Sequence, residues 1–452
     1  MTSSPSRDSN LTSQLARVRS TLAPQPVRVE GRLVRAHGMT LEARGCEAPV
    51  GSLCDIVGHD GDVIAAEVVG FADEKLQLMP IDTHRGVSPG SRVVPRSPAR
   101  DVEVGPALLG RIIDGAGRAL DGGGPVETTD RTSLVPGPLN PLKREPITKP
   151  LDVGIRAING LLTIGEGQRV GLFAGSGVGK STLLGALTRH TVADVVVVCL
   201  IGERGREVRD FVDNILTSDG MKRAVIVATP ADATPVMRLQ GAQRATAIAE
   251  YFRDAGLSVL LLMDSLTRFA QAQREIALSV GEFPVAKGYT TSVFSMLPQL
   301  VERAGNYNGG SITGIYTVLV EGDDHEDPIS DAARAILDGH IVLSRQVAES
   351  GLYPAIDVAR SVSRLVTQLV PEEAQRLMRE FRGTYSTYET NRDLISLGAY
   401  VRGSDPMIDR SIDLQPRVRA YIEQGEHEAV SMDESRAALV SLFMEGAEHV
   451  DL

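Results

Sequence analysis

The most constraining feature of the sequence is a glycine-rich stretch, AGSGVGKS, at residues 174–181. Small residues let consecutive backbone N–H groups surround phosphate oxygens, the lysine can reach the β- and γ-phosphates, and the final hydroxyl can hold Mg²⁺. Residues 168–173 are mostly apolar and predict a strand, whereas leucines spaced along 181–190 predict a helix. This strand–loop–helix order predicts a site for the phosphates of a nucleotide.

The predicted nucleotide-binding residues follow from this motif. Lys180 and Ser181 carry its two side-chain roles. The first position is usually glycine, and Ala174 fits there if it ends the strand at negative φ, because only positive φ requires glycine. The predicted set is Gly175, Ser176, Gly177, Val178, Gly179, Lys180, Ser181 and Thr182.

Composition and charge narrow the class of protein. A length of 452 residues predicts two or three domains. A net charge of −11 argues against a general nucleic-acid binder, which would usually be basic. Three cysteines without metal-binding spacing indicate reduced thiols, and no apolar run approaches the length needed to span a bilayer. We therefore expect a cytoplasmic protein.

The N-terminal part of the chain divides into two regions. Residues 1–26 form an arm in which Leu11, Leu15, Val18 and Leu22 lie at helical spacing, which predicts a helix that binds a partner or packs on its own body. Residues 27–98 alternate short apolar runs with turns, including Asp60-Gly61, and predict a small β-barrel. Its expected strands are 27–34, 52–57, 63–69, 76–79 and 92–94.

Two further regions follow. Residues 99–370 predict an α/β domain around the phosphate loop, although 105–150 is rich in glycine and proline and predicts little regular structure. Near-continuous apolar strands are expected because both faces of a parallel sheet are covered. They are predicted at 194–201, 224–229, 258–263 and 312–320, with helices at 206–217, 235–254 and 266–280. Residues 371–452 predict a helical C-terminal domain.

Acidic residues follow two of the predicted strands. Asp264 ends the apolar run 259–263, so we expect it at the sheet edge beside the phosphate loop, where it can hold Mg²⁺ or a metal-bound water. Glu203 comes directly after the strand 194–201 and is a candidate to orient and polarise an attacking water. Glu207 is a candidate to support the water shell of the metal.

One arginine far downstream is a candidate for stabilising charge on a transferred phosphoryl group. Arg364 lies in the short segment 361–364, and an arginine finger in such a position is worth roughly 10³–10⁵ in rate. From these residues alone, an ordinary salt-bridged arginine is the favoured alternative.

Longer motifs resemble the flagellar and type III protein-export ATPases, which are relatives of the ATP synthase catalytic subunit. The resemblance covers roughly residues 105–400, and the segments 309–313 and 321–324 look more like the flagellar branch. It implies a RecA-like core that hydrolyses ATP with Mg²⁺. The runs that carry it are 202–208, 263–275, 338–345 and 353–357.

The resemblance also implies roles for single residues. Arg204 would lie close to the catalytic Glu203, Arg268 would approach the γ-phosphate, and Tyr353 would stack on adenine. Arg364 would be a finger that reaches the site of a neighbouring subunit. Because one chain carries both Glu203 and Arg364, which the ATP synthase divides between two kinds of subunit, we expect a homo-oligomeric ring, most simply a hexamer.

The partners that the resemblance implies belong to a protein-export apparatus at the inner membrane. They are a regulatory export protein at the N-terminal helix, a central-stalk protein, the export gate, and substrates with their chaperones, with membrane association only through these partners. The family often has prolines where this chain has Phe283 and Thr290-Thr291, in loops expected to face the centre of the ring.

Several alternatives stay open at this point. One alternative is an ATPase of a virulence type III secretion system, which would act in the same way but serve a different export apparatus. A rotary ATP synthase subunit conflicts with the presence of both Glu203 and Arg364, and a nucleic-acid translocase conflicts with the acidic charge and with Phe71 as the single barrel aromatic. A non-catalytic scaffold conflicts with the retained Lys180 and Glu203.

Overall fold

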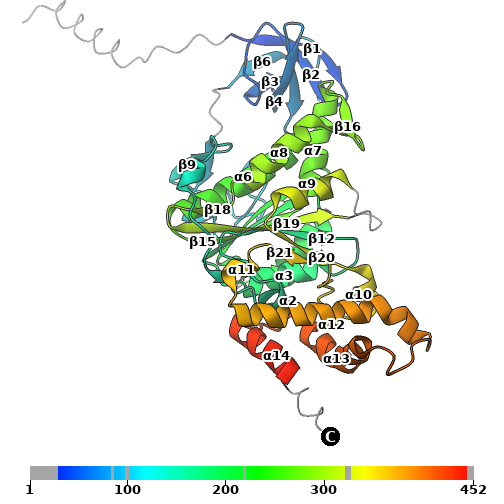
Figure 1. Ribbon diagram of the computed structural model, residues 1–452. Coiled ribbons are helices and arrows are strands. Elements are labelled where there is room, and N and C mark those ends of the chain that lie inside the picture. The colour runs from blue at the N-terminus through cyan, green and yellow to red at the C-terminus, as the bar shows by residue number, and fades with distance from the viewer. Residues whose placement is uncertain (1–28, 83–85, 97–100, 217–219, 321–326, 445–452) are drawn as a thin grey trace, which may run out of the picture. The chain divides into compact units, whose positions relative to one another are not determined.

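The computed structural model describes residues 29–82, 86–96, 101–216, 220–320 and 327–444 (Figure 1). The described chain forms two compact units, one of residues 29–78 with 86–96 and the other of residues 79–82 with 101–444. The predicted N-terminal helix at 11–22 and the segment 321–324 lie outside the described residues. The domain boundaries drawn from the sequence stay predictions.

The first unit is a closed six-stranded barrel with the strand order β1-β2-β5-β4-β3-β6. Alternate residues point inward, so that Leu41, Ile56 and Leu78 are fully buried, as expected for strands with one solvent-facing side. The predicted barrel is confirmed. Its strands are β1 Gly31–His37, β2 Thr40–Arg44, β3 Leu53–Val57, β4 Val63–Ala72, β5 Lys75–Pro80 and β6 Arg92–Pro95.

Two details of the barrel can be compared with the prediction from the sequence. The turn at Asp60-Gly61 joins β3 to β4 as predicted, with Val57 paired to Val63 and Gly61 at a φ of 86°. Strand β2 was missed, because its residues TLEAR contain only one large apolar side chain and their pairing with β1 and β5 supplies the extended conformation.

The second unit is built on a sheet with the strand order β21-β20-β12-β19-β15-β13-β14-β8. Every neighbouring pair from β20 to β8 is parallel, so these strands end at one common edge. The short strands β18 Gly305–Tyr307 and β21 join it antiparallel. The main strands are β8 Ile112–Ile113, β12 Arg169–Ala174, β13 Val195–Ile201, β14 Ala224–Thr229, β15 Ser258–Asp264, β19 Gly310–Leu319, β20 Gly339–Leu343 and β21 Val362–Ser363.

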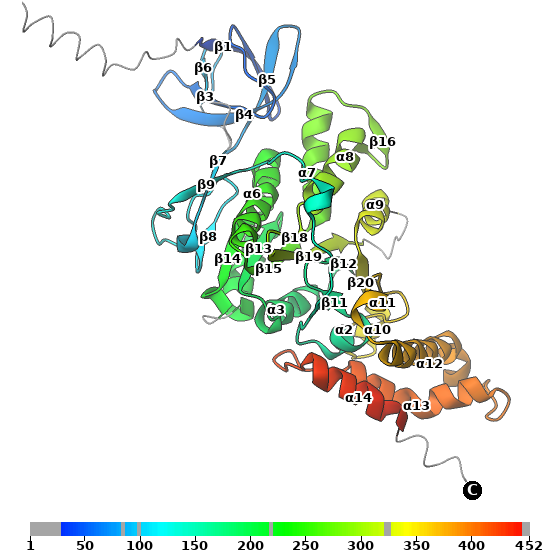
Figure 2. The same ribbon diagram turned by 60° about the vertical axis from the view of Figure 1, so that its left-hand side comes forward.

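Helices cover both faces of this sheet (Figures 1 and 2). All seven residues of β13 are buried, which explains its unbroken apolar run. Helices α6 Pro235–Asp254 and α7 Leu266–Ser279 contact strands on one face, and α3 Lys180–His190 shares a core with Val196 and Leu260 on the other. The remaining helices of this region are α2 Arg156–Leu161, α4 Gly205–Asp210, η3 Phe211–Leu216, α8 Thr291–Val301, α9 Pro328–Ile336, α10 Arg345–Glu349 and α11 Val366–Leu369.

Two sequence expectations need correction here. The single helix predicted at 206–217 is α4 followed by η3, which has π-helical hydrogen bonding. The stretch 105–150 contains more regular structure than expected, because β8 pairs with the edge strand β14, a long-range contact that local composition does not reveal. This stretch also holds the short elements η1 Pro106–Leu108, β9 Asp130–Ser133, which pairs with β7 Asp101–Val104, and η2 Pro141–Lys143; β10 Pro150–Leu151 pairs with β11 Ile164–Gly165.

The predicted helical C-terminal region is confirmed and consists of α12 Glu372–Ser396, α13 Pro406–Ile422 and α14 Met432–Met444. Phe381 of α12, Val418 of α13 and Leu439 of α14 belong to the same hydrophobic core as α2 and α3. The helices therefore pack onto the α/β core within one unit, as Figure 1 shows.

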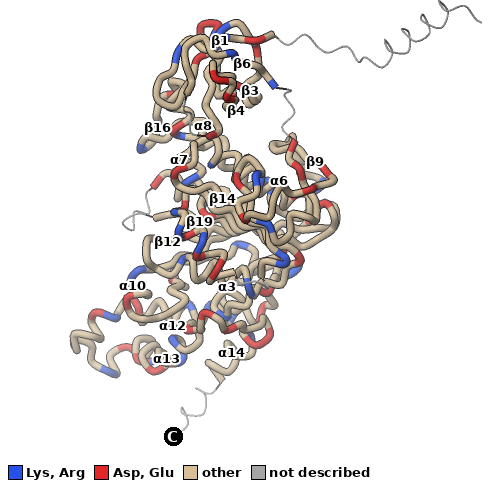
Figure 3. The backbone as a smooth tube through the Cα atoms, turned by 180° about the vertical axis from the view of Figure 1, so that it is seen from behind, with Lys and Arg blue, Asp and Glu red and all other residues tan. Residues whose placement is uncertain are grey.

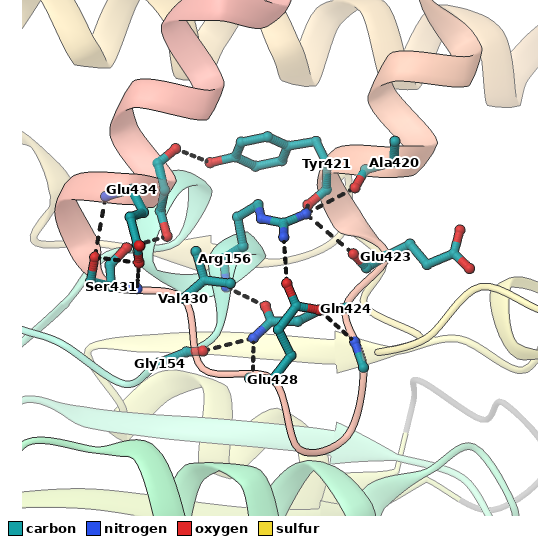
Figure 4. A network of polar contacts seen from close by, with 12 residues as sticks. Gly154, Arg156, Ala420, Tyr421, Glu423, Gln424, Glu428, Val430, Ser431 and Glu434 are labelled. Atoms are coloured by element: carbon teal, nitrogen blue, oxygen red, sulfur yellow. Dashed lines mark hydrogen bonds and ion pairs between the residues drawn. The ribbon is translucent and has the colours of Figure 1, made fainter.

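A polar network fastens these helices to the loop before α2 (Figure 4). Arg156 Nη1 donates to the carbonyl of Ala420 at 3.0 Å and also reaches those of Tyr421 and Glu423, so a cation caps the last carbonyls of α13. The buried Gln424 side chain accepts from Arg156 N at 2.7 Å and donates to the carbonyl of Gly154 at 2.8 Å. This end of α13 is thus fixed to the chain that leads into the nucleotide-binding core.

No helix among the described residues is long and apolar enough to cross a membrane. Cys46, Cys54 and Cys199 are all buried free thiols, as the sequence predicts.

The packing of α2 against α13 yields a stability test. A Cβ at Gly160 would overlap the Tyr421 hydroxyl, which donates to the carbonyl of Ser435 at 2.9 Å. We expect Gly160→Ala to destabilise the protein by about 1–3 kcal/mol through overpacking, seen as a lower Tm in thermal unfolding. The control Gly383→Ala lies in α12 with nothing within 4 Å of its Cβ position, and it should stabilise by roughly 0.5–1 kcal/mol. Equal Tm values for Gly160→Ala and the parent would contradict this packing.

Candidate functional site

The phosphate loop connects β12 to α3 at the common edge where the parallel strands end. Ala174 is the last residue of β12 and is not among the described residues with positive φ, so glycine is not required there. Gly177 and Gly179 have φ values of 77° and 86°, which other residues adopt only with strain. The predicted strand–loop–helix context is therefore present, with the loop opening toward the N-terminus of α3.

Three predicted site residues meet at this edge. Lys180 begins α3, Asp264 ends β15 and Glu203 follows β13. Lys180 Nζ donates to both carboxylate oxygens of Asp264 at 2.6 Å and to Glu203 Oε1 at 3.2 Å. Their side chains are only 14 %, 7 % and 16 % exposed, respectively, so water screens this cluster poorly.

The environment shifts the pKa of two members of the cluster in the same direction for different reasons. Burial works to lower the pKa of Lys180, but the neighbouring charges of Asp264 and Glu203 outweigh it and raise that pKa. Burial raises the pKa of Glu203, against the opposing charge of Lys180. The lysine is thus held charged, while Glu203 is made a better proton acceptor than an exposed carboxylate.

The turn after β13 determines where Glu203 lies. Gly202 has a φ of 66°, and its backbone N–H donates to the carbonyl of Thr229 at 2.7 Å. Arg268 of α7 packs over Gly202, because a Cβ there would lie 3.1 Å from Arg268 Cδ. The structure therefore brings Arg268 next to the turn that carries Glu203.

Arg204 and Glu207 lie on the exposed side of this turn. The Arg204 side chain is 71 % exposed, and Glu207 Oε1 lies 3.8 Å from Arg204 Nη1 and 3.9 Å from Arg206 Nη2. Glu207 also shares a side-chain hydrogen bond with Glu203, which adds to the burial that raises the pKa of Glu203. The roles of Arg204 and Glu207 at the site stay predictions.

Tyr353 lies beside the phosphate loop. A Cβ at Gly179 would be 3.5 Å from Tyr353 Cε1, and nearly half of the tyrosine surface is exposed. The carbonyl of Tyr353 accepts from the backbone N–H of Gln424, which follows α13. An exposed aromatic ring next to the loop is suited to stack on a base.

Arg364 lies at the opposite end of the sheet. Its backbone N–H donates to the carbonyl of Asp338 at 3.0 Å and its Nη2 to the carbonyl of Arg334 at 2.9 Å. Asp338 pairs with Arg169 at the start of β12, and the five residues from there to Ala174 span about 16 Å. Arg364 is therefore separated from the phosphate loop of its own chain.

The residues near Lys180 fit a magnesium ion held partly by a nucleotide. Ser181 is exposed at the start of α3, as is Thr182, and the buried Asp264 supplies a carboxylate. No three His, Cys, Asp or Glu side chains in the described part of the chain gather as a protein-only metal cage. Mg²⁺ usually takes one or two carboxylates together with substrate phosphates and water, so such a cage is not needed.

Sequence reasoning missed two polar contacts to site residues. Thr317 of β19 donates its hydroxyl to Asp264 Oδ1 at 2.6 Å, and Gln271 Oε1 accepts from Arg268 Nη1 at 2.9 Å. The sequence did offer one indication of a polar contact at Thr317, because this threonine interrupts the apolar run 312–320. Gln271 lies one helical turn from Arg268, but α7 has several polar residues, and the sequence did not show which of them would contact Arg268.

Comparison with known proteins matches both parts of the second unit. The nucleotide-binding domain of the ATP synthase alpha/beta family matches residues 154–363, and the type III secretion EscN ATPase C-terminal domain matches residues 370–441. The flagellum-specific ATP synthase of Pseudomonas aeruginosa is 57 % identical over 94 % of this chain and 95 % of its own length.

Solved structures give the same result. The assembled ATPase EscN of the enteropathogenic E. coli type III secretion system matches with a TM-score of 0.86 and 41 % identity, over 91 % of this chain and 99 % of EscN. EscN in complex with its central stalk EscO matches with a TM-score of 0.83 and 40 % identity over the same shares. The phosphate loop, the paired family domains and these full-length relatives lead to one conclusion: the chain belongs to the flagellar and type III secretion ATPases.

Proposed function

We propose that this chain hydrolyses ATP with Mg²⁺ to energise protein export by a flagellar type III apparatus, acting as a homo-oligomeric ring. The observation that carries the proposal is the cluster of Lys180 with Asp264 and Glu203 beside the phosphate loop. Identity of 57 % to a flagellum-specific relative, against 41 % to EscN, favours the flagellar branch.

The residues divide the chemistry of hydrolysis. The phosphates of ATP compete with Asp264 and Glu203 for Lys180, and the loop N–H groups bind the phosphate oxygens. Ser181 and Asp264 would hold Mg²⁺, which would neutralise charge on the phosphates. Glu203 orients the attacking water and accepts its proton, with Glu207 and Arg204 beside it on the same turn. Arg268 contacts the γ-phosphate, and Tyr353 stacks on adenine.

Arg364 completes the site of the next subunit. It lies at the opposite sheet end from its own Lys180 and makes its side-chain hydrogen bond to a backbone carbonyl, that of Arg334. In a ring, this arginine reaches a neighbour's γ-phosphate, where it stabilises charge in the transition state. Because each subunit supplies both halves of a site, identical copies suffice to close a ring, and we propose that six of them do so.

The remaining partners follow from the export role. EscN binds a central stalk, and we propose that the helical C-terminal region of this chain meets an equivalent protein. The arm at 1–26 binds a regulatory export protein, and the ring works in the cytoplasm at the inner-membrane export gate, on substrates and their chaperones. The hairpin β16 Pro284–Ala286 and β17 Tyr289–Thr290, with Phe283 85 % exposed, faces the centre of the ring.

The rival readings receive less support. Lys and Arg positions are interspersed with Asp and Glu along the described backbone (Figure 3), whereas a nucleic-acid translocase needs a continuous basic track. A rotary ATP synthase subunit needs a second subunit type, so ATPase activity of a ring made from this chain alone would exclude it. Nucleic-acid stimulation with steep salt dependence would revive the translocase.

Removal of the phosphate-loop lysine tests the enzymatic proposal. Lys180→Ala should lower ATPase activity by at least about a hundredfold, because a charge that acts on the transferred phosphates is removed. Phosphate release from purified protein measures this. The control Lys149→Ala removes a lysine whose side chain is 79 % exposed and should keep normal activity. Wild-type activity in Lys180→Ala would overturn the assignment.

Metal removal gives a second test. Chelation by EDTA should abolish hydrolysis, and added Mg²⁺ should restore it. The reason is that the metal proposed at Ser181 and Asp264 would neutralise the charge of the phosphates during the reaction. Phosphate release in a magnesium titration records the recovery. Hydrolysis that continues in excess EDTA would contradict the magnesium role.

Mixed assembly tests the action of Arg364 across subunits. Arg364→Ala and Lys180→Ala should each be inactive alone, yet a mixture should recover part of the activity, since some interfaces pair an intact loop with an intact arginine. Phosphate release is measured on mixtures whose co-assembly is verified by affinity tags. Failure to recover activity in verified mixed rings would argue against a finger in trans.

A further inference from the structure

Thr317 is a fully buried residue on β19, the strand that lies between the phosphate-loop strand β12 and the Asp264 strand β15. It is paired with Leu172 of β12, and its neighbour Tyr316 is paired with Met263 of β15. These registers place the Thr317 side chain next to Asp264. Its hydroxyl lies 2.6 Å from Asp264 Oδ1 and 3.4 Å from the carbonyl of Met263, so the carboxylate is its closer acceptor.

Among the described residues, two side chains donate hydrogen bonds to the Asp264 carboxylate. We expect a bound nucleotide to affect one of these hydrogen bonds and not the other. Lys180 contacts both oxygens at 2.6 Å, whereas Thr317 contacts Oδ1 alone. Bound phosphates would compete with Asp264 for Lys180, whereas Thr317 lies on the central strand β19 and would keep its hydrogen bond. The hydroxyl would then be the group that still holds the Asp264 carboxylate.

A carboxylate without such a partner has a broad choice of orientations about its terminal torsion. Groups that orient a metal-binding side chain commonly change metal affinity or activity by 10- to 100-fold when they are removed. We propose that Thr317 is a positioning residue that sets the orientation of Asp264 and so determines how strongly magnesium is held with the nucleotide. This inference rests on the proposed role of Asp264 at the metal.

The test measures the binding of fluorescent ADP to the full chain during a magnesium titration, independently of hydrolysis. Thr317→Val keeps the shape of the side chain and removes the hydroxyl, and it should raise the half-saturating Mg²⁺ concentration roughly tenfold or more. ADP binding in EDTA should change little, because the loop and Lys180 are intact. Thr317→Ser restores a hydroxyl and should return the titration close to that of the parent.

Thr313→Val is the matched control. Thr313 lies four residues earlier on the same face of β19 and is equally buried, but its hydroxyl oxygen accepts from Gly167 N at 2.8 Å, away from Asp264. This variant should keep the parent's magnesium dependence even if its Tm falls. If Thr317→Val does not fold, Thr317→Ala removes the same hydroxyl with less crowding and replaces it in the titration.

The outcomes separate this inference from the proposed function. Magnesium titrations that coincide for Thr317→Val and the parent, equal shifts in Thr313→Val, or no recovery in Thr317→Ser would each overturn the positioning role. Lys180→Ala with normal ATPase activity would instead overturn the proposed function. A tenfold shift confined to the variants that lack the Thr317 hydroxyl supports the inference.

Discussion

The parallel direction of the central strands is the constraint on which the site depends. Parallel neighbours end at the same edge, so residues at or shortly after the ends of β12, β13 and β15 come together, although Lys180 and Asp264 are 84 positions apart. These strands are packed on both faces, so a shift in their register would misplace close-packed side chains against the covering helices. Packing of the core thereby fixes the geometry of the charges.

The positive charge of Lys180 is paired before any nucleotide arrives. Two carboxylates share this lysine in a poorly screened place, so it is not left as a buried, unpaired cation. The phosphates of a nucleotide must therefore replace Glu203 and Asp264 as partners of Lys180. Under the proposed roles, binding would free Glu203 for the attacking water and Asp264 for the metal.

The sequence predicted those strands whose own pattern of apolar residues matches their burial in the folded protein. The strands β13, β14, β15 and β19 could be recognised because burial on both faces demands unbroken apolar runs. Glu203 and Asp264 follow from where two such runs end, and Lys180 follows from the glycine-rich loop. Strands β2 and β8 could not, since their extended form depends on partners distant in the sequence. The contact of Thr317 with Asp264 was hidden for the same reason: it exists only across two paired strands.

The separation of Arg364 from the phosphate loop along β12 has a consequence for assembly. Each subunit carries the binding half of a site at one end of its sheet and, under the proposed role of Arg364, the completing half at the other. An open arc of subunits always leaves one loop without a partner, and a lone subunit has no complete site. Under the proposed role of Arg364, closure of the ring would be the step that makes every site equivalent, and a subunit outside the ring would hydrolyse ATP slowly.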